Sequence, residues 1–97
     1  MMKNTKTPLI EYTEFFNKQR KEAPLEIKIA FREALELFLE NPNDPYLRDH
    51  ALKEKLAGYR SFDITDDWRA VYNIKLIGDQ EVIMFHMLGT HEQLYNK

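Results

Sequence analysis

An aspartate pair and a histidine near the end of the chain are the residues whose types could do acid–base chemistry. Asp66 and Asp67 lie between two predicted strands, and His91 follows a third. A carboxylate and an imidazole at one edge of a sheet can act as base and acid in cleaving a phosphodiester by its adjacent 2′-hydroxyl. One group removes the hydroxyl proton and the other protonates the leaving 5′-oxygen. A guanidinium, Arg69 or Arg60, could offset charge developing on the phosphorane.

The strands predicted around these residues explain why they should converge. Apolar and polar residues alternate from Arg60 to Ile64 and again from Trp68 onward, and Glu81 to Leu88 forms a further strand. The acidic segment between the first two predicts a tight turn, since short carboxylate side chains cap their own backbone. In an up-down-up meander, the end of the first strand, the start of the second and the end of the third share one edge. The residues expected at that edge are Thr65, Asp66, Asp67, Trp68, Thr90 and His91.

Each candidate also has a purely structural interpretation. Asp66 and Asp67 are typical turn residues, and His91 could simply cap a final helical turn. His50 lies in a polar connection, where histidines are usually exposed, and His86 lies in mid-strand, as structural histidines do. No ligand spacing of the His-Glu-x-x-His kind occurs, so we predict no metal site.

The first half of the chain predicts one short strand and two helices. Thr7 to Tyr12 is a plausible strand, Thr13 is a good N-cap, and the first helix should cover Glu14 to Glu22. Pro24 suits the first position of a second helix, because the amide it lacks would be unpaired there. An apolar stripe at spacings of three and four then follows, ended by the prolines of residues 41–45. The stripe comprises Ile27, Ala30, Phe31, Ala34, Leu35, Phe38 and Leu39.

This order of elements predicts an α+β fold. Two N-terminal helices should pack on one face of a mainly antiparallel sheet of about four strands. Tyr46 to Lys55 is expected to be a polar connection, and Ile77 to Gln80 a turn. The 97 residues, 1–97, are enough for one domain with a single core and too few for two.

Composition narrows the class of protein. There is no cysteine, so disulfides and thiolate sites are excluded. Neither a signal peptide nor an apolar run of the roughly 20 residues that span a membrane is visible, and a cytoplasmic location is expected. The net charge of −2 provides no global basic field, so nucleic acid would have to bind through a local patch. No cofactor motif is present.

Several short motifs, in their order and spacing, resemble those of the RelE/YafQ superfamily of bacterial type II toxins. They are Asn41-Pro42-x-Asp44-Pro45, His50-x-Leu52, Leu56-x-Gly58-Tyr59-Arg60-Ser61, Asp66-Asp67-Trp68-Arg69-Ala70-Val71-Tyr72 and Gly89-Thr90-His91-x-x-Leu94-Tyr95. The resemblance runs from about residue 9 to 95. It implies a small, metal-independent, ribosome-dependent endoribonuclease that cuts mRNA in the decoding site and leaves a 2′,3′-cyclic phosphate or 3′-phosphate. It also implies a cognate antitoxin.

The resemblance also assigns roles to residues. It implies catalytic positions at His50, Asp67 and His91, with Asp67 as base, His91 as acid and His50 assisting. Tyr95 matches a C-terminal aromatic that contributes to catalysis or base stacking, and Arg69 matches an arginine that steadies the scissile phosphate. The side chains expected to meet ribosomal or messenger phosphates are Lys53, Lys55 and Arg60.

Two departures from the family pattern leave alternatives open. Asp63 stands where the YafQ-like pattern has another catalytic histidine, and Met84 and Met87 lie where the family usually places an arginine. Both changes remove positive charge from the predicted site. One alternative is therefore a ParE-like relative that inhibits DNA gyrase by binding, and another is a relative that keeps only weak catalysis or binding.

Overall fold

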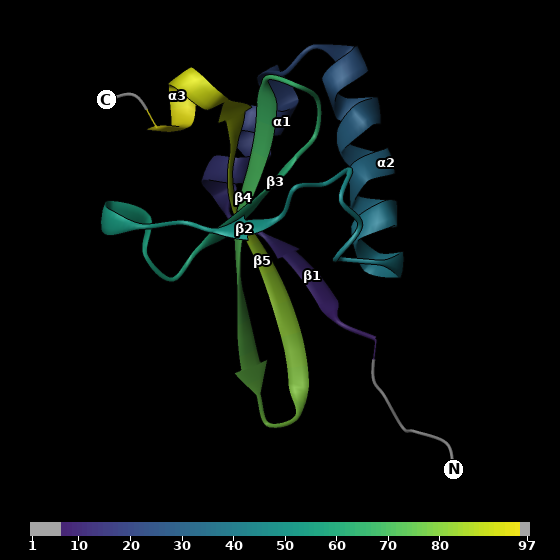
Figure 1. The fold of residues 1–97 in the computed structure, drawn as a ribbon, viewed down its shortest axis with the longest axis vertical. Helices are drawn as coiled ribbons and strands as arrows, with labels where there is room; N and C mark the ends of the chain where they lie inside the picture. The colour runs from purple at the N-terminus through teal and green to yellow at the C-terminus, as the bar shows by residue number, and fades with distance from the viewer. Residues whose placement is uncertain (1–6, 96–97) are drawn as a thin grey trace.

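The computed structural model describes residues 7–95, which form a five-stranded sheet with two long helices on one face (Figure 1). The strands are β1 (Leu9–Tyr12), β2 (His50–Ala51), β3 (Arg60–Asp63), β4 (Trp68–Ile77) and β5 (Gln80–Thr90). The helices are α1 (Glu14–Glu22), α2 (Leu25–Glu40), the 3₁₀ turn η1 (Glu54–Leu56) and α3 (His91–Tyr95). The strand order is β1-β5-β4-β3-β2, in which only the β1–β5 pair is parallel.

The predicted α+β architecture is confirmed, with one strand more than expected. The additional strand is β2, which pairs His50 with Ser61 and Ala51 with Arg60 within the segment predicted to be a polar connection. Two residues are too few to show a period-two pattern, and both are exposed, so the sequence carried no signal for this strand.

The helices begin and end close to where local chemistry predicts. Thr13 caps α1 by accepting a hydrogen bond from the Phe16 N–H at 3.0 Å. Pro24 lies one position earlier than predicted, at the N-cap of α2, because its ψ of 152° is extended. The prolines after Asn41 coincide with the end of α2. Within residues 7–95, no helix is long and apolar enough to cross a bilayer.

An aromatic core lies between α1, α2 and one face of the sheet, which we call the helix-covered face. Phe85 of β5 packs there against Phe16 of α1 and Phe31 of α2. Phe62 of β3 and Tyr72 of β4 pack against Phe38 of α2. The stripe predicted along α2 buries Ile27, Phe31 and Phe38, whereas Leu39 remains 44% exposed. The core therefore fixes the sheet from one side only.

Successive side chains of a strand point to opposite faces, so the neighbours of these core residues lie on the other side of the sheet, which we call the open face. A bulge between Val71 and Tyr72 leaves His86 as an extra residue in β5 and keeps the core residues aligned on both sides of it. The open face carries Ser61, Asp63, Arg69, Val71, Asn73, Met84 and Met87. Several of its central side chains are polar, in contrast to the aromatic face beneath the helices.

Candidate active site

The edge of the sheet where the candidate acid and base should meet is formed as predicted. Trp68 pairs with Thr90 in the β4–β5 register, and the His91 N–H donates to the Asp67 carbonyl at 2.8 Å. Both Asp67 and His91 are exposed at this edge. The structure therefore brings together two residues 24 positions apart in the sequence (91 minus 67) and leaves both accessible to a ligand.

The turn that carries Asp67 is held by a hydroxyl and a guanidinium. The Thr65 Oγ1 accepts hydrogen bonds from the Asp67 N–H at 3.3 Å and the Trp68 N–H at 3.1 Å. The Arg69 Nη1 donates to the Asp66 carbonyl at 2.9 Å and the Thr65 carbonyl at 3.3 Å. The prediction that the carboxylates cap this turn is wrong, because within residues 7–95 their side chains make no hydrogen bond or ion pair. The Asp67 carboxylate therefore makes no contact that holds the turn.

A reciprocal pair of hydrogen bonds positions α3, which carries His91. The Thr90 Oγ1 accepts from the Gln93 N–H at 3.1 Å, and the Gln93 Oε1 accepts from the Thr90 N–H at 2.9 Å. This is a capping box, readable from Thr90-x-x-Gln93 but absent from the sequence prediction. Gly89 allows the helix to approach the strand, since a Cβ there would lie 2.9 Å from the Gln93 Oε1.

Tyr95 connects α3 to the open face. Its hydroxyl donates to the Ser61 Oγ at 3.2 Å, and its ring packs edge-on against the His91 imidazole at 4.8 Å between centroids. Ser61 is fully buried and pairs with His50 in the β2–β3 register. Ser61, which sequence reasoning missed, therefore links the strand pair that carries His50 to Tyr95, whose ring contacts His91.

His50 has a defined tautomer. Its Nδ1 lies 2.9 Å from the Arg48 carbonyl oxygen, which can only accept, so Nδ1 carries the hydrogen. His50 is exposed, and in the neutral form of its ring Nε2 is then an acceptor. This geometry suits a group that assists acid–base chemistry.

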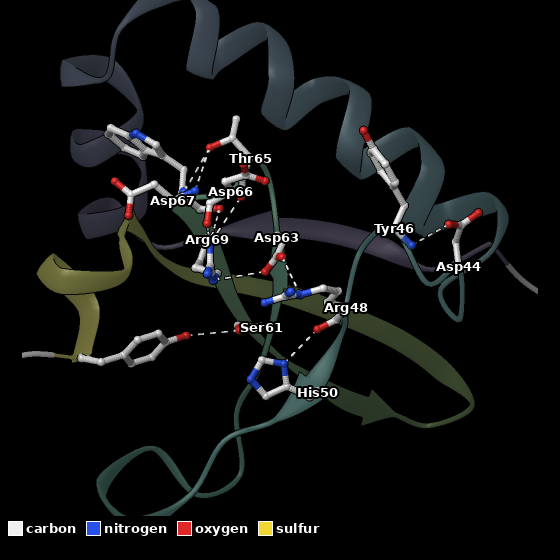
Figure 2. A network of polar contacts seen from close by, with 12 residues as sticks. Asp44, Tyr46, Arg48, His50, Ser61, Asp63, Thr65, Asp66, Asp67 and Arg69 are labelled. Carbon is white, nitrogen blue, oxygen red and sulfur yellow. Dashed lines mark hydrogen bonds and ion pairs between the residues drawn. The ribbon is translucent and has the colours of Figure 1, made fainter.

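Asp63 is held between two arginines (Figure 2). The Arg48 Nε lies 3.0 Å from Asp63 Oδ2, and the Arg69 Nε lies 3.1 Å from Asp63 Oδ1. Both contacts are ion pairs, and Asp63 Oδ1 is buried and accepts no hydrogen bond within residues 7–95. Arg69 is only 8% exposed, which favours a role in holding Asp63 and the turn over direct contact with a phosphate.

The three predicted phosphate contacts lie in two different surroundings. Lys53 and Lys55 are exposed around η1, in the connection that projects from the sheet (Figure 1). Arg60 points to the helix-covered side, where its Nε and Nη2 each lie 2.7 Å from Asp49 Oδ1. The hydrogen bond to Asp49 is the main cause that raises the pKa of Arg60.

The Tyr72 hydroxyl donates to the other Asp49 oxygen. Burial, followed by this hydrogen bond, raises the pKa of Tyr72.

The remaining polar residues of the open face have structural partners. The His86 Nε2 lies 2.9 Å from the Asn73 Oδ1, and the His86 ring packs edge-on against Tyr59 at 4.9 Å. Met84 and Met87 lie on the same face and carry no charge, whereas Arg48 and Arg69 are the arginines that contact Asp63 there. Among residues 7–95 no three His, Asp or Glu side chains are grouped so that they could hold a metal ion.

Comparisons with known proteins agree with this fold. A family model described as the bacterial toxin YafQ of type II toxin–antitoxin systems matches residues 9–96. The crystal structure of YafQ from E. coli strain BL21(DE3) is 26% identical in sequence, with a TM-score of 0.74 over 92% of this chain and 99% of that chain. A search of curated protein sequences gave no match.

Two further structures are similar in fold at lower identity. The E. coli DinJ–YafQ toxin–antitoxin complex is 24% identical, with a TM-score of 0.72 over 93% of this chain and 99% of that chain. A YoeB/ParE toxin from Agrobacterium tumefaciens is 17% identical, with a TM-score of 0.70 over 86% of this chain and 98% of that chain. At these identities the similarity shows the fold alone.

Proposed function

The chain belongs to the YafQ family of bacterial type II toxins, and we propose that it is a ribosome-dependent endoribonuclease that cleaves mRNA and thereby inhibits translation. The observation that carries the proposal is the shared edge of β4 and β5. There an exposed carboxylate and an exposed imidazole lie on residues joined by the 2.8 Å hydrogen bond from the His91 N–H to the Asp67 carbonyl. An RNA strand lying across this edge could meet both groups.

The proposed reaction is an attack by the RNA itself. The Asp67 carboxylate removes the proton of a 2′-hydroxyl, and the 2′-oxygen forms a bond to the adjacent phosphorus. The bond from phosphorus to the 5′-oxygen breaks, and the His91 imidazolium donates its proton to that leaving oxygen. The products are a 2′,3′-cyclic phosphate and a 5′-hydroxyl. These steps use only side chains of this chain and the RNA, without a metal cofactor.

Supporting roles follow from the contacts around this pair. His50 assists proton transfer through Nε2, since its Nδ1 hydrogen is donated to the Arg48 carbonyl. Tyr95 orients His91 by packing against its ring and is itself fixed through Ser61. Arg69 acts as a positioning residue for the turn that presents Asp67.

The surrounding cations contribute unequally to binding RNA. Exposed Lys53 and Lys55 would contact phosphates of the message or the ribosome without reading sequence. Arg60 is less suited to this task, because Asp49 already pairs with its guanidinium on the helix-covered side. Its proposed effect on RNA binding is therefore smaller than that of the lysines.

A cognate antitoxin is proposed as the protein partner, by analogy with the DinJ–YafQ complex of similar fold. Co-expression of such an antitoxin should restore the growth of cells that produce this chain. Growth that remains arrested in the presence of every short reading frame adjacent to its gene would contradict this part of the proposal.

Induced expression of the wild type beside His91→Ala tests the function. We expect the wild type to stop growth and produce new mRNA 5′-ends, and His91→Ala to lose at least about a hundredfold in cleavage of mRNA on programmed ribosomes. Because His91 is exposed, its variant should keep the wild-type melting temperature. Growth arrest with intact mRNA and altered DNA supercoiling would overturn the proposal and indicate a gyrase-binding toxin instead.

A further inference from the structure

Arg48 places an exposed cation beside the candidate site. Its side chain is 69% accessible, whereas those of Arg69 and Asp63 are 10% and 13% accessible. One edge of its guanidinium is held through Nε by Asp63, and its two terminal nitrogens make no hydrogen bond within residues 7–95. The group is thus fixed on one side and presents its other side to solvent.

The backbone at Arg48 is unusual and ties this cation to the site. Its φ of 50° lies in the left-handed region, which residues with a side chain rarely adopt. The Arg48 carbonyl accepts the Nδ1 hydrogen of His50, and the Asp63 N–H donates to the Leu47 carbonyl at 2.7 Å. A strained residue held in place by its neighbours is often part of a functional arrangement. Here the same residue orients His50 and presents the guanidinium.

Asp63 neutralises only one of the two arginines that it contacts. Arg48 and Arg69 contribute two positive charges and Asp63 one negative, so the three together carry +1. Arg69 is buried against the turn carbonyls, which leaves Arg48 as the member that a ligand can reach. A guanidinium with two outward terminal nitrogens matches the paired oxygens of a phosphodiester better than it matches any neutral group.

We propose that Arg48 binds a phosphate of the RNA strand next to the cleaved bond, and that Asp63 is the positioning residue that holds it there. This inference rests on the proposed endoribonuclease function and names a contact of its substrate. Asp63 then does not transfer a proton. Its carboxylate is held by Arg69 and in turn holds the Arg48 guanidinium in position. Arg48 supplies at this face the positive charge that Met84 and Met87 do not provide.

Cleavage of mRNA on programmed ribosomes at increasing protein concentration tests the contact. For Arg48→Ala we expect the concentration that gives half of the maximal rate to rise about tenfold or more, since a charge-assisted hydrogen bond is lost. The maximal rate should change less than this concentration, because the substitution keeps the backbone carbonyl that holds His50, and the Arg48 side chain touches neither the 2′-oxygen nor the leaving oxygen. Arg48→Lys, which keeps the charge, should recover part of the affinity.

Arg32→Ala is the matched control, because it removes the same charge from an exposed position on α2, on the other side of the sheet. It should behave as the wild type. Equal effects of Arg48→Ala and Arg32→Ala would overturn the proposal, since only net charge would then matter. Unchanged half-maximal concentrations in both variants would overturn it too.

Asp63→Asn tests whether Asp63 positions Arg48 or acts only through its negative charge. The two roles predict opposite changes in the half-maximal concentration. Removal of an anion beside the RNA should tighten binding if charge alone counts. If Asp63 aims Arg48, the half-maximal concentration should rise instead, and a lower one would overturn the positioning role. Circular dichroism checks that Asp63→Asn is folded; if it is not, the comparison of Arg48 with Arg32 decides alone.

The outcome also distinguishes this inference from the function on which it rests. A wild-type protein that leaves mRNA intact on programmed ribosomes contradicts the endoribonuclease itself. A wild type that cleaves, with Arg48→Ala and Arg32→Ala cleaving equally well at every concentration, contradicts only the role of Arg48.

Discussion

On the helix-covered face, aromatic rings of Phe16, Phe31, Phe38, Phe62, Tyr72 and Phe85 pack with neighbouring centroids 5.0 to 5.9 Å apart. The open face has charged and hydroxyl groups at its centre, fixed by ion pairs at 3.0 and 3.1 Å and by the hydrogen bond from Tyr95 to Ser61. Both faces belong to the same three strands. Burial of apolar area holds the first face together, whereas directional contacts determine the second.

The difference matters because packing and chemistry place opposite demands on a surface. Close-packed rings stabilise the fold but expose nothing that can transfer a proton. Polar groups can do chemistry only if they remain accessible and keep their geometry, which requires partners such as Asp63 for Arg48. The stability of the sheet should therefore depend mainly on one face and RNA cleavage mainly on the other.

The largest expected effect on stability comes from Phe16, which is fully buried in the aromatic core. Phe16→Ala should lower the free energy of unfolding by about 3–5 kcal/mol, because it removes buried area and leaves a cavity. Phe15→Ala is the control on the same helix, where a side chain 55% exposed should contribute less than about 0.5 kcal/mol. Urea unfolding followed by circular dichroism measures both. Similar losses in the two variants would show that the helix-covered face does not dominate stability.

Loss of an ion pair on the open face should lower the free energy of unfolding by less than loss of Phe16. Arg69→Met takes a partner from Asp63 and a donor from the turn carbonyls, which should cost about 1–3 kcal/mol. The double variant Asp63→Leu with Arg69→Met removes both charges and should recover most of that loss, since a buried ion pair often stabilises no better than apolar residues.

Cleavage should not recover with stability in this double variant, because Arg48 has lost its anchor. Urea unfolding and cleavage on programmed ribosomes, measured on the same preparations, test the two parts together. If the double variant is as unstable as Arg69→Met, the pair is needed for the fold and the contrast between the two faces is weaker than proposed.

Thr13 connects helix α1 to strand β5. Its substitution should lower the free energy of unfolding by a moderate to small amount. Its Oγ1 accepts from the Phe16 N–H at 3.0 Å, and its hydroxyl donates to the His86 carbonyl at 3.3 Å. Thr13→Ala should cost about 0.5–2 kcal/mol in the free energy of unfolding, as loss of an N-cap does. Thr13→Ser keeps the hydroxyl and should remain close to the wild type in thermal unfolding. An equal loss in both variants would assign the effect to the methyl group instead.

The features that the sequence predicted are those determined by capping preferences and by the periodicity of the strands. The cap at Thr13, the bounds of α1 and the meeting of Asp67 with His91 follow from capping preferences and from the period-two pattern of three consecutive strands. A final helical turn at His91 was also predicted as an alternative, but the capping box Thr90-x-x-Gln93 that starts it was not.

The features that it did not predict depend on contacts that no pattern in the sequence marks. β2 exists because two exposed residues pair with β3, and no periodicity marks so short a strand. The RNA contact of Arg60 stays a prediction, but the sequence did not reveal that its side chain points to the face opposite that of Ser61 and pairs with Asp49. Arg48 was missed because its importance comes from Asp63, 15 positions later by residue number (63 minus 48), and from a backbone conformation that the sequence does not reveal.

His86 should give the smallest effect, visible only in the dependence of stability on pH. Burial, followed by the charge of Lys75, lowers the pKa of His86, which also contacts Asn73 and Tyr59. The unfolded chain therefore binds the proton more readily than the folded protein. As the pH falls below about 6.5, the ordinary histidine value, the free energy of unfolding should decrease on this account and then level off below the lowered pKa.

His86→Gln removes this group while keeping a donor for Asn73, and all other titratable groups are common to both proteins. The variant should therefore lose less stability than the wild type between about pH 7.5 and pH 5. Urea unfolding at several pH values measures the difference. Parallel curves for the two proteins would mean that His86 titrates alike in the folded and unfolded chain. The open face would then tolerate a charged imidazole among its directional contacts, which an aromatic core could not.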